Sequence, residues 1–539
     1  MRRCARRNLN ICLRVRGSTF NRGLADGREH LLNVDVLASS EHAAAEAAPL
    51  AISDGTPGTL STAALASASA ARRMSTQANA AASHEISPGL PSHPRAIYSA
   101  RLGARGVDFE HPDFPLLFAS TRAYTPVAGG GPASVDHVLG RLGQFDHKYG
   151  GGAGAMGGVG ARVAVLRGAA DLIEEESLPL AKMVMEEAGK TVVDAINEVR
   201  ELVDFFRFYA AQAEETLVEK RLNTVTGEEN TLVPMPRGNW LCVGPFNFPL
   251  AIVGGLSSAA FVAGNPVVIK PHPATPRCAA AIVDVLRRAG MPEDGMTVVL
   301  DEPLDAPVGS GAAPAGSSAG SQLVASGAFA GVSFVGSSAT AAAINYSLAV
   351  ATMEKGAPLA RLVAETGGLN VLVADASALP EQVCDAVVAS FAGAAGQRCS
   401  SARVLVLDAG CKASVMRLVG GALAELRVGD PLDVATDVGP LISATAAQAA
   451  RHHCARLEAG GATLACSSAA HLELDTVESV DDLVEMAREH GAYANAALFH
   501  PRVYELHPAG VAGLDMLAGE VFAPVLHVVE YDGRAPPTL

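Results

Sequence analysis

Short apolar stretches alternate with longer helical ones from about residue 239 onward, and this pattern restricts the possible folds strongly. The expected strands are residues 240–243, 266–270, 296–300 and 331–335, and the expected helices are residues 250–262, 277–289 and 338–350. Strands that alternate with helices predict a parallel sheet with helices on both faces. Open sheets of this kind bind ligands where their strands end.

A second alternation follows, with strands expected near residues 370–375 and 403–407 and a helix over about 379–393 between them. Upstream, apolar residues recur at helical spacing from residue 161 and over residues 192–213, which predicts two amphipathic helices. The Gly/Ser-rich residues 309–321 are expected to form a surface insertion. The sequence therefore predicts an α/β protein with two sheets.

Composition excludes several classes of function. The chain has 539 residues, 49% of them hydrophobic, which is enough for two or more domains with cores. A formal charge of −15 argues against nucleic acid or an anionic membrane as the main partner. No uninterrupted apolar run is long enough to predict a membrane span. The nine cysteines form no CxxC pair, so neither a disulfide framework nor a metal site is expected, and a reducing compartment is favoured.

The N-terminal segment is rich in arginine. Seven arginines precede the first acidic residue, Asp26, and residues 72–76 form a plausible processing region. Such a start is typical of an organelle transit peptide. We therefore expect residues 1–90 to be a transit peptide and disordered segment, directed to the mitochondrial matrix or, as second choice, to a plastid. The alternative is a wrongly assigned start codon that adds a disordered tail.

Two residues carry the chemistry of nucleophilic catalysis. Glu365 precedes a Gly-Gly pair, and Cys399 follows Gly-Gln-Arg. A thiol is a nucleophile only as the thiolate, which a basic, helix-terminal setting favours. A nearby carboxylate could act as general base for the thiol or for a later water. Taken singly, a cysteine is more often a small core residue and a glutamate a solvated one.

Two further motifs lie where expected strands end. Residues 244–249 contain Asn247, whose amide could donate to an oxyanion or, alternatively, cap the following helix. Residues 334–338 contain Gly336 and Ser337 at the start of a helix, where backbone N–H groups suit a pyrophosphate.

Together these motifs resemble the aldehyde dehydrogenase superfamily. Its Glu-x-Gly-Gly and Gly-Gln-x-Cys segments imply that Glu365 is the general base and Cys399 the nucleophile. Residues 244–249 are similar to its Pro-Trp-Asn-Phe-Pro signature, with Phe246 in place of Trp. The resemblance implies that Asn247 holds the oxyanion and that Pro245 and Phe246 contact a nicotinamide cofactor.

The same resemblance implies the rest of a cofactor site. Lys270 would reach the ribose hydroxyls, Gly336 and Ser337 would meet the pyrophosphate, and Glu520 and Phe522 would lie beside the nicotinamide ribose and ring. Pro273 stands where the family usually places an acidic residue that helps the lysine. Its presence weakens the preference for NAD over NADP, so NAD is expected and NADP is not excluded.

A narrower resemblance is to the Δ1-pyrroline-5-carboxylate dehydrogenase part of bifunctional proline-utilisation proteins. It is carried by residues 105–108, 198–211, 364–379 and 395–404. It implies oxidation of glutamate γ-semialdehyde to glutamate. The alternatives are another semialdehyde dehydrogenase, such as one for succinate semialdehyde, and a catalytically impaired, truncated relic that binds nucleotide or partner subunits.

The resemblance also implies the domain organisation. After residues 1–90 we expect an approach segment with Gly-rich linkers (91–160), a Rossmann-type NAD(P)-binding domain (161–362) and a catalytic domain (363–539). The family continues beyond the Glu520 segment with a substrate loop and an oligomerisation strand. The catalytic domain is therefore expected to be incomplete and the protein poorly soluble, although the family forms homo-oligomers.

Overall fold

A computed structural model describes residues 12–14, 104, 114–126, 134–148, 157–223, 225–301, 318–468, 497–506 and 519–533. The chain divides into a larger unit, Met1–Ser18 with Ser120–Leu539, and a smaller one, Thr19–Ala119. Helix α2 (Phe114–Ser120) begins in the smaller unit, where Phe114 stacks on Phe118. The predicted transit peptide, except for residues 12–14, and the motif at residues 105–108 lie outside the described residues.

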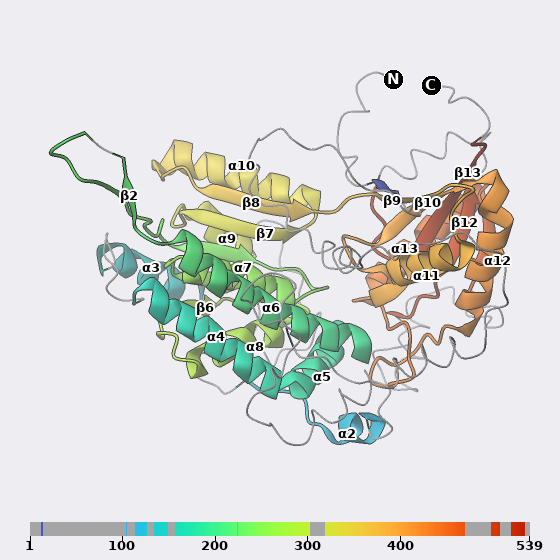
Figure 1. Cartoon of the computed structure of the whole chain (residues 1–539), viewed down its shortest axis with the longest axis horizontal. Coiled ribbons are helices and arrows are strands. Elements are labelled where there is room, and N and C mark those ends of the chain that lie inside the picture. The colour runs from blue at the N-terminus through green and yellow to red at the C-terminus, as the bar shows by residue number, and fades with distance from the viewer. Residues whose placement is uncertain are drawn as a thin grey trace, which may run out of the picture. The chain divides into compact units, whose positions relative to one another are not determined.

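The first sheet of the larger unit has five parallel strands in the order β6-β5-β4-β7-β8. They are β4 (Trp240–Val243), β5 (Val267–Lys270), β6 (Met296–Val298), β7 (Gly331–Gly336) and β8 (Arg361–Thr366). The covering helices are α7 (Ala251–Val262), α8 (Pro276–Arg288), α9 (Ala319–Ala325) and α10 (Ser338–Lys355). Figure 1 shows α10 and α7 on opposite sides of this sheet.

Among the described residues, four helices and a hairpin lie between α2 and β4. They are α3 (Val135–Lys148), α4 (Val159–Glu175), α5 (Ser177–Ala188), α6 (Val192–Thr216), and the hairpin of β2 (Lys220–Leu222) and β3 (Asn230–Leu232). The apolar stripe of α6 is buried along its length, from Val192 through Val199 to Ala210. It packs against α4, α5 and α7, so the periodicity in the sequence identified the face that meets the core.

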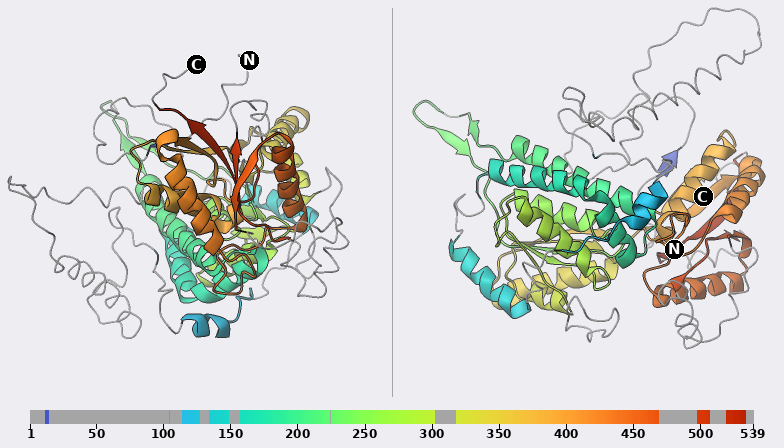
Figure 2. Two further views of the ribbon diagram at one scale, coloured as in Figure 1. Left: turned by 90° about the vertical axis from the view of Figure 1, so that its right-hand side faces the viewer. Right: turned by 90° about the horizontal axis from the view of Figure 1, so that it is seen from below.

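The second sheet has the strand order β1-β9-β10-β13-β12-β11 and is parallel except for the β11–β12 pair. Its strands are β1 (Cys12–Arg14), β9 (Asn370–Ala374), β10 (Ala402–Asp408), β11 (Thr463–Ser467), β12 (Arg502–Leu506) and β13 (Val525–Tyr531). Its helices are α11 (Pro380–Phe391), α12 (Ala409–Glu425) and α13 (Ala444–Ala459). Figure 2 shows helices on both sides of these orange and red strands.

Alternation along β13 explains how this sheet is covered. Leu526 and Val528 enter the core formed with α11 and α12. Val525 enters a separate core with α13, and His527 meets His453 of that helix. Because successive side chains of a strand point to opposite faces, β13 contributes residues to the cores on both faces of the sheet.

The α/β prediction is confirmed, and the predicted strands and helices agree with the observed ones to within a few residues. One expectation was wrong in part: Ser318 caps α9 and Ala319–Ala325 are helical, so the end of the expected insertion at 309–321 is ordered secondary structure. Residues 302–317 lie outside the described residues. The domain limits stay a prediction. The boundary expected between residues 362 and 363 falls within strand β8. Within the described parts of the chain, no helix combines the length and the apolar character that crossing a membrane requires.

Candidate active site

The carboxyl edge of the five-stranded sheet gathers most of the predicted site residues. Lys270 ends β5, residues 245–247 follow β4, Gly336 and Ser337 end β7 and open α10, and Glu365 lies one residue before the end of β8. These four strands are neighbours and run in one direction. Their carboxyl ends therefore share one edge, the usual ligand site of such sheets.

Cys399 lies in the loop between α11 and β10, which we call the Cys399 loop (residues 392–401). Ala394, Ala395 and Gly396 have consecutive positive φ angles of 51°, 53° and 67°. Each alanine in this conformation costs about 1–3 kcal/mol, and such strain concentrates at functional sites. A Cβ on Gly396 would lie 2.5 Å from the Pro524 nitrogen, so the loop closely approaches the segment that precedes β13.

Asp194, in the first turn of α6, holds both ends of the strained part of this loop. Its carboxylate accepts a hydrogen bond from the Ala394 N–H (3.0 Å) and forms an ion pair with Arg398. Sequence reasoning did not identify Asp194, because the contact spans about 200 residues of chain. An acidic residue in the first turn of a helix is ordinary in sequence and gives no signal of such a contact.

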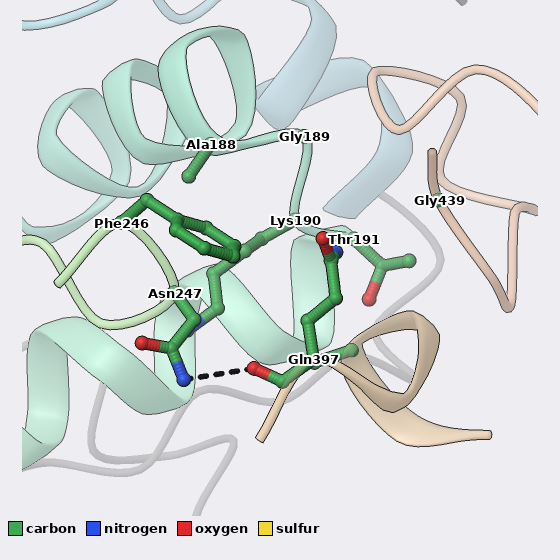
Figure 3. A pocket seen from close by; sticks show the side chains of 9 residues that line it. Ala188, Gly189, Lys190, Thr191, Phe246, Asn247, Gln397 and Gly439 are labelled. Carbon is green, nitrogen blue, oxygen red and sulfur yellow. Dashed lines mark hydrogen bonds between the residues drawn. The ribbon is translucent and has the colours of Figure 1, made fainter. Parts of the chain in front are cut away.

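Asn247 is buried and reaches the Cys399 loop. Its Nδ2 donates to the Gln397 carbonyl over 2.8 Å, two residues before Cys399 (Figure 3). The amide carries a second N–H, which could donate to an oxyanion. The small pocket in Figure 3 is lined by Asn247, Gln397 and Lys190, among others, but by neither Cys399 nor Glu365. The pocket therefore adjoins the reacting groups without containing them.

The surroundings of the Cys399 thiol are acidic. Cys399 is exposed as a residue, yet desolvation of its thiol raises the pKa, and the charges of Glu520 and then Glu365 raise it further, against backbone N–H donors that lower it. Arg398, the cation next to Cys399 in sequence, is engaged by Asp194. The structure brings the two carboxylates within electrostatic reach of the thiol.

Arg403 connects the Cys399 loop to the segment that contains Glu520 and Phe522. It is 1% exposed, donates to the carbonyls of Ala523 (3.0 Å) and Arg398 (3.2 Å), and pairs with Glu520 at 3.5 Å. Sequence reasoning did not identify it. An arginine near the start of a buried strand, four residues after the nucleophile, was the available signal, because a buried cation requires partners.

Glu520 leaves no space for a side chain at Gly367, the first glycine of the Gly-Gly pair after Glu365. A Cβ on Gly367 would lie 1.8 Å from Glu520 Oε2, so a larger residue would displace that carboxylate.

Phe522 packs edge-on against Phe246 with ring centroids 5.8 Å apart, and Phe246 also meets the His272 ring at 5.2 Å. Predicted cofactor residues from the two sheets thus lie in contact.

Lys270 has a carboxylate partner that sequence reasoning did not identify. Its Nζ lies 2.5 Å from Asp301 Oδ2, and the two side chains are only 9% and 15% exposed. Asp301 follows β6, the strand next to β5. The sequence suggested that Pro273 leaves the lysine without an acidic neighbour; the structure supplies one from another strand.

Comparisons with known proteins agree with this geometry. The model of the "Aldehyde dehydrogenase family" matches residues 158–535. "Bifunctional protein PutA" of Klebsiella aerogenes is 35% identical over 373 residues, which are 69% of this chain and 25% of that protein. A "1-pyrroline-5-carboxylate dehydrogenase" of Geobacillus sp. is 29% identical over 346 residues, 62% of this chain and 64% of that one.

Among solved structures, a variant of proline utilization A from Bradyrhizobium japonicum superposes with a TM-score of 0.67 at 35% identity. The match covers 83% of this chain and 41% of that one. The chain spans about a quarter of the length of the curated PutA relatives. It belongs to the aldehyde dehydrogenase family, whose members use NAD or NADP.

Proposed function

We propose that this chain oxidises L-glutamate γ-semialdehyde to glutamate, with NAD or NADP as hydride acceptor. The observation that carries the chemistry is the convergence on the Cys399 loop: the charges of Glu365 and Glu520 act on the thiol, and Asn247 binds the main chain two residues away. The substrate is supported by the likeness to proteins named PutA and 1-pyrroline-5-carboxylate dehydrogenase.

In the first half of the reaction the Cys399 thiolate forms a bond to the aldehyde carbon, and the carbonyl oxygen becomes an oxyanion. The second N–H of Asn247 and the backbone N–H of Cys399 donate to this oxygen. One such donor is worth roughly a hundredfold to a thousandfold in rate. A bound nicotinamide cofactor would supply the acceptor for the hydride of the same carbon, and loss of that hydride would leave a thioester on Cys399.

In the second half Glu365 takes a proton from water, and the water oxygen bonds to the acyl carbon. The bond to sulfur breaks, which releases the carboxylic acid and returns the thiol. Division into two steps replaces one difficult oxidation by two easier reactions.

The residues at the carboxyl edge fit a nicotinamide dinucleotide. A Cβ on Gly336 would lie 2.6 Å from the Phe334 ring, so a larger residue would displace that buried ring. The start of α10 follows directly, and the backbone N–H groups of a helix start suit a pyrophosphate. Ser337 caps that helix by accepting from the Thr340 N–H at 3.1 Å. In the proposal the residues that would hold the cofactor are Pro245, Phe246, Lys270, Gly336, Ser337, Glu520 and Phe522.

The test is turnover of the full chain with glutamate γ-semialdehyde and with succinate semialdehyde, beside Cys399→Ala and Glu365→Gln. We expect faster turnover with the glutamate derivative, none in Cys399→Ala, and in Glu365→Gln a burst of one reduced cofactor per chain followed by turnover roughly 100- to 10,000-fold slower. Cysteine-independent turnover would refute the mechanism. Preference for succinate semialdehyde would refute only the substrate.

A further inference from the structure

The pair formed by Lys270 and Asp301 is built into the carboxyl edge of the first sheet. Asp301 lies three residues after β6, and Lys270 is the last residue of β5. Ile269 is in register with Val298, so the two chain segments leave the sheet side by side. The pair therefore sits at the same edge as Pro245, Phe246 and Ser337, where β5 and β6 end.

Both side chains are fixed by further contacts. Asp301 Oδ1 accepts from the Ala319 N–H at 2.8 Å, and Lys270 Nζ donates to the Pro271 carbonyl at 2.9 Å. A carboxylate offers about four acceptor sites and an ammonium three N–H donors. After these contacts and the ion pair, the described surroundings leave acceptor sites on Asp301 and one donor on Lys270. A sugar hydroxyl both donates and accepts, so this combination suits a vicinal diol.

We propose that Asp301 accepts hydrogen bonds from the adenosine ribose hydroxyls of the cofactor and selects NAD over NADP. This inference rests on the proposed nicotinamide-dependent function. In open α/β sheets an acidic residue at a strand end binds the ribose 2′-hydroxyl of NAD, whereas 2′-phosphate requires a cation. Lys270 alone would attract that phosphate. Asp301 neutralises the lysine and repels the phosphate, and it takes the place of the carboxylate that Pro273 does not supply.

The experiment measures the Kd values of NAD and NADP for the full chain by isothermal titration calorimetry. Three proteins are compared: wild type, Asp301→Asn and the matched control Asp294→Asn. Asp294 precedes the same strand at its opposite end and pairs with Arg141. We expect wild type to bind NAD more tightly, and Asp301→Asn to shift the ratio of the two Kd values toward NADP by about tenfold to a hundredfold. Asp294→Asn should keep the wild-type ratio.

An unchanged ratio in folded Asp301→Asn would overturn the proposal. If that variant does not fold, a measurement on wild type replaces it. An NAD analogue with a 2′-deoxy adenosine ribose should then bind wild type at least about tenfold more weakly than NAD does. Equal affinity for the analogue would also overturn it. If wild type bound neither dinucleotide, the proposed function itself would fail, an outcome distinct from binding both equally well.

Discussion

At the scale of single residues, the acidic surroundings of Cys399 determine how its reactivity depends on pH. Desolvation first, and then the charges of Glu520 and Glu365, raise the pKa of the thiol, so most of it is protonated at neutral pH in the free protein. Removal of a negative charge should lower that pKa. We therefore predict that Glu520→Gln alkylates faster than wild type at pH 7, and that Glu365→Gln shows a smaller gain in the same direction.

The measurement is the rate of Cys399 carbamidomethylation between pH 6 and 11, followed by peptide mass spectrometry. The buried Cys242 is the internal control, because burial raises its pKa and it should stay unmodified in the native protein. If the pH midpoint were the same in Glu520→Gln and wild type, Glu520 would not act on the thiol.

At the scale of elements, the first turn of α6 fixes the Cys399 loop. Asp194 accepts from the Ala394 N–H and pairs with Arg398, so one side chain spans the residues with positive φ. Asp194→Asn keeps an acceptor but loses the charge. We predict that turnover falls by about tenfold, since small displacements of a reacting group cost up to a hundredfold.

A role in positioning can be separated from a role in ionisation. The rate of Cys399 alkylation should fall at every pH in Asp194→Asn while its pH midpoint stays in place. Asp171→Asn, at an exposed aspartate that pairs with Arg207, is the matched control and should leave both quantities unchanged. A shifted midpoint with undiminished turnover would contradict the positioning role.

Local sequence patterns predicted those elements whose residues are buried in regular repeats. The four residues of β5 are all buried, and the α6 stripe has a period of 3.6. Strand β8 was not predicted, because its residues alternate irregularly between exposed and half-buried and it is charged at Arg361 and Glu365. Helix α9 was not predicted, because it begins within a Gly/Ser-rich sequence. Ser318 of that sequence is the N-cap of the helix.

The site was predictable only in part, for a similar reason. Asn247, Lys270 and Glu365 each lie in a local motif that follows or ends a strand, and Cys399 lies in a local motif between α11 and β10. Asp194, Asp301 and Arg403 act through contacts between segments that are far apart in sequence. Such contacts depend on strand order, which the sequence pattern leaves open.

At the scale of the larger unit, its two sheets each contribute part of the site. The carboxyl edge of the first sheet carries Asn247 and Phe246, and the second carries Gln397 and Phe522, which they contact. Stability of the second sheet therefore bears directly on catalysis. The interior of that sheet contains a feature that responds to pH, the buried pair of His453 on α13 and His527 on β13.

These two imidazoles are 5% and 2% exposed, and their Nε2 atoms lie 2.9 Å apart. His527 Nδ1 lies 2.7 Å from the Arg403 carbonyl, which can only accept, so Nδ1 carries the proton and His527 Nε2 accepts from His453. This assignment applies to two neutral rings, the state that burial favours. Burial, with the charges of His527, Arg456 and His452, lowers the pKa of His453 from 6.5 to about 4, and burial lowers that of His527.

A histidine whose pKa is lower in the folded than in the unfolded protein stabilises the fold above pH 6.5, and this stabilisation is lost as pH falls through 4. For His453 the difference corresponds to roughly 3 kcal/mol, of which about 2 kcal/mol is lost by pH 5. We predict that His453→Gln, which keeps a donor but cannot ionise, loses less free energy of unfolding between pH 7.5 and pH 5 than wild type. Urea denaturation measures this, with His137→Gln at an exposed histidine of α3 as the control. Equal losses in His453→Gln and wild type would mean that the pair does not resist protonation, and the acid sensitivity of the fold would then have to come from its carboxylates.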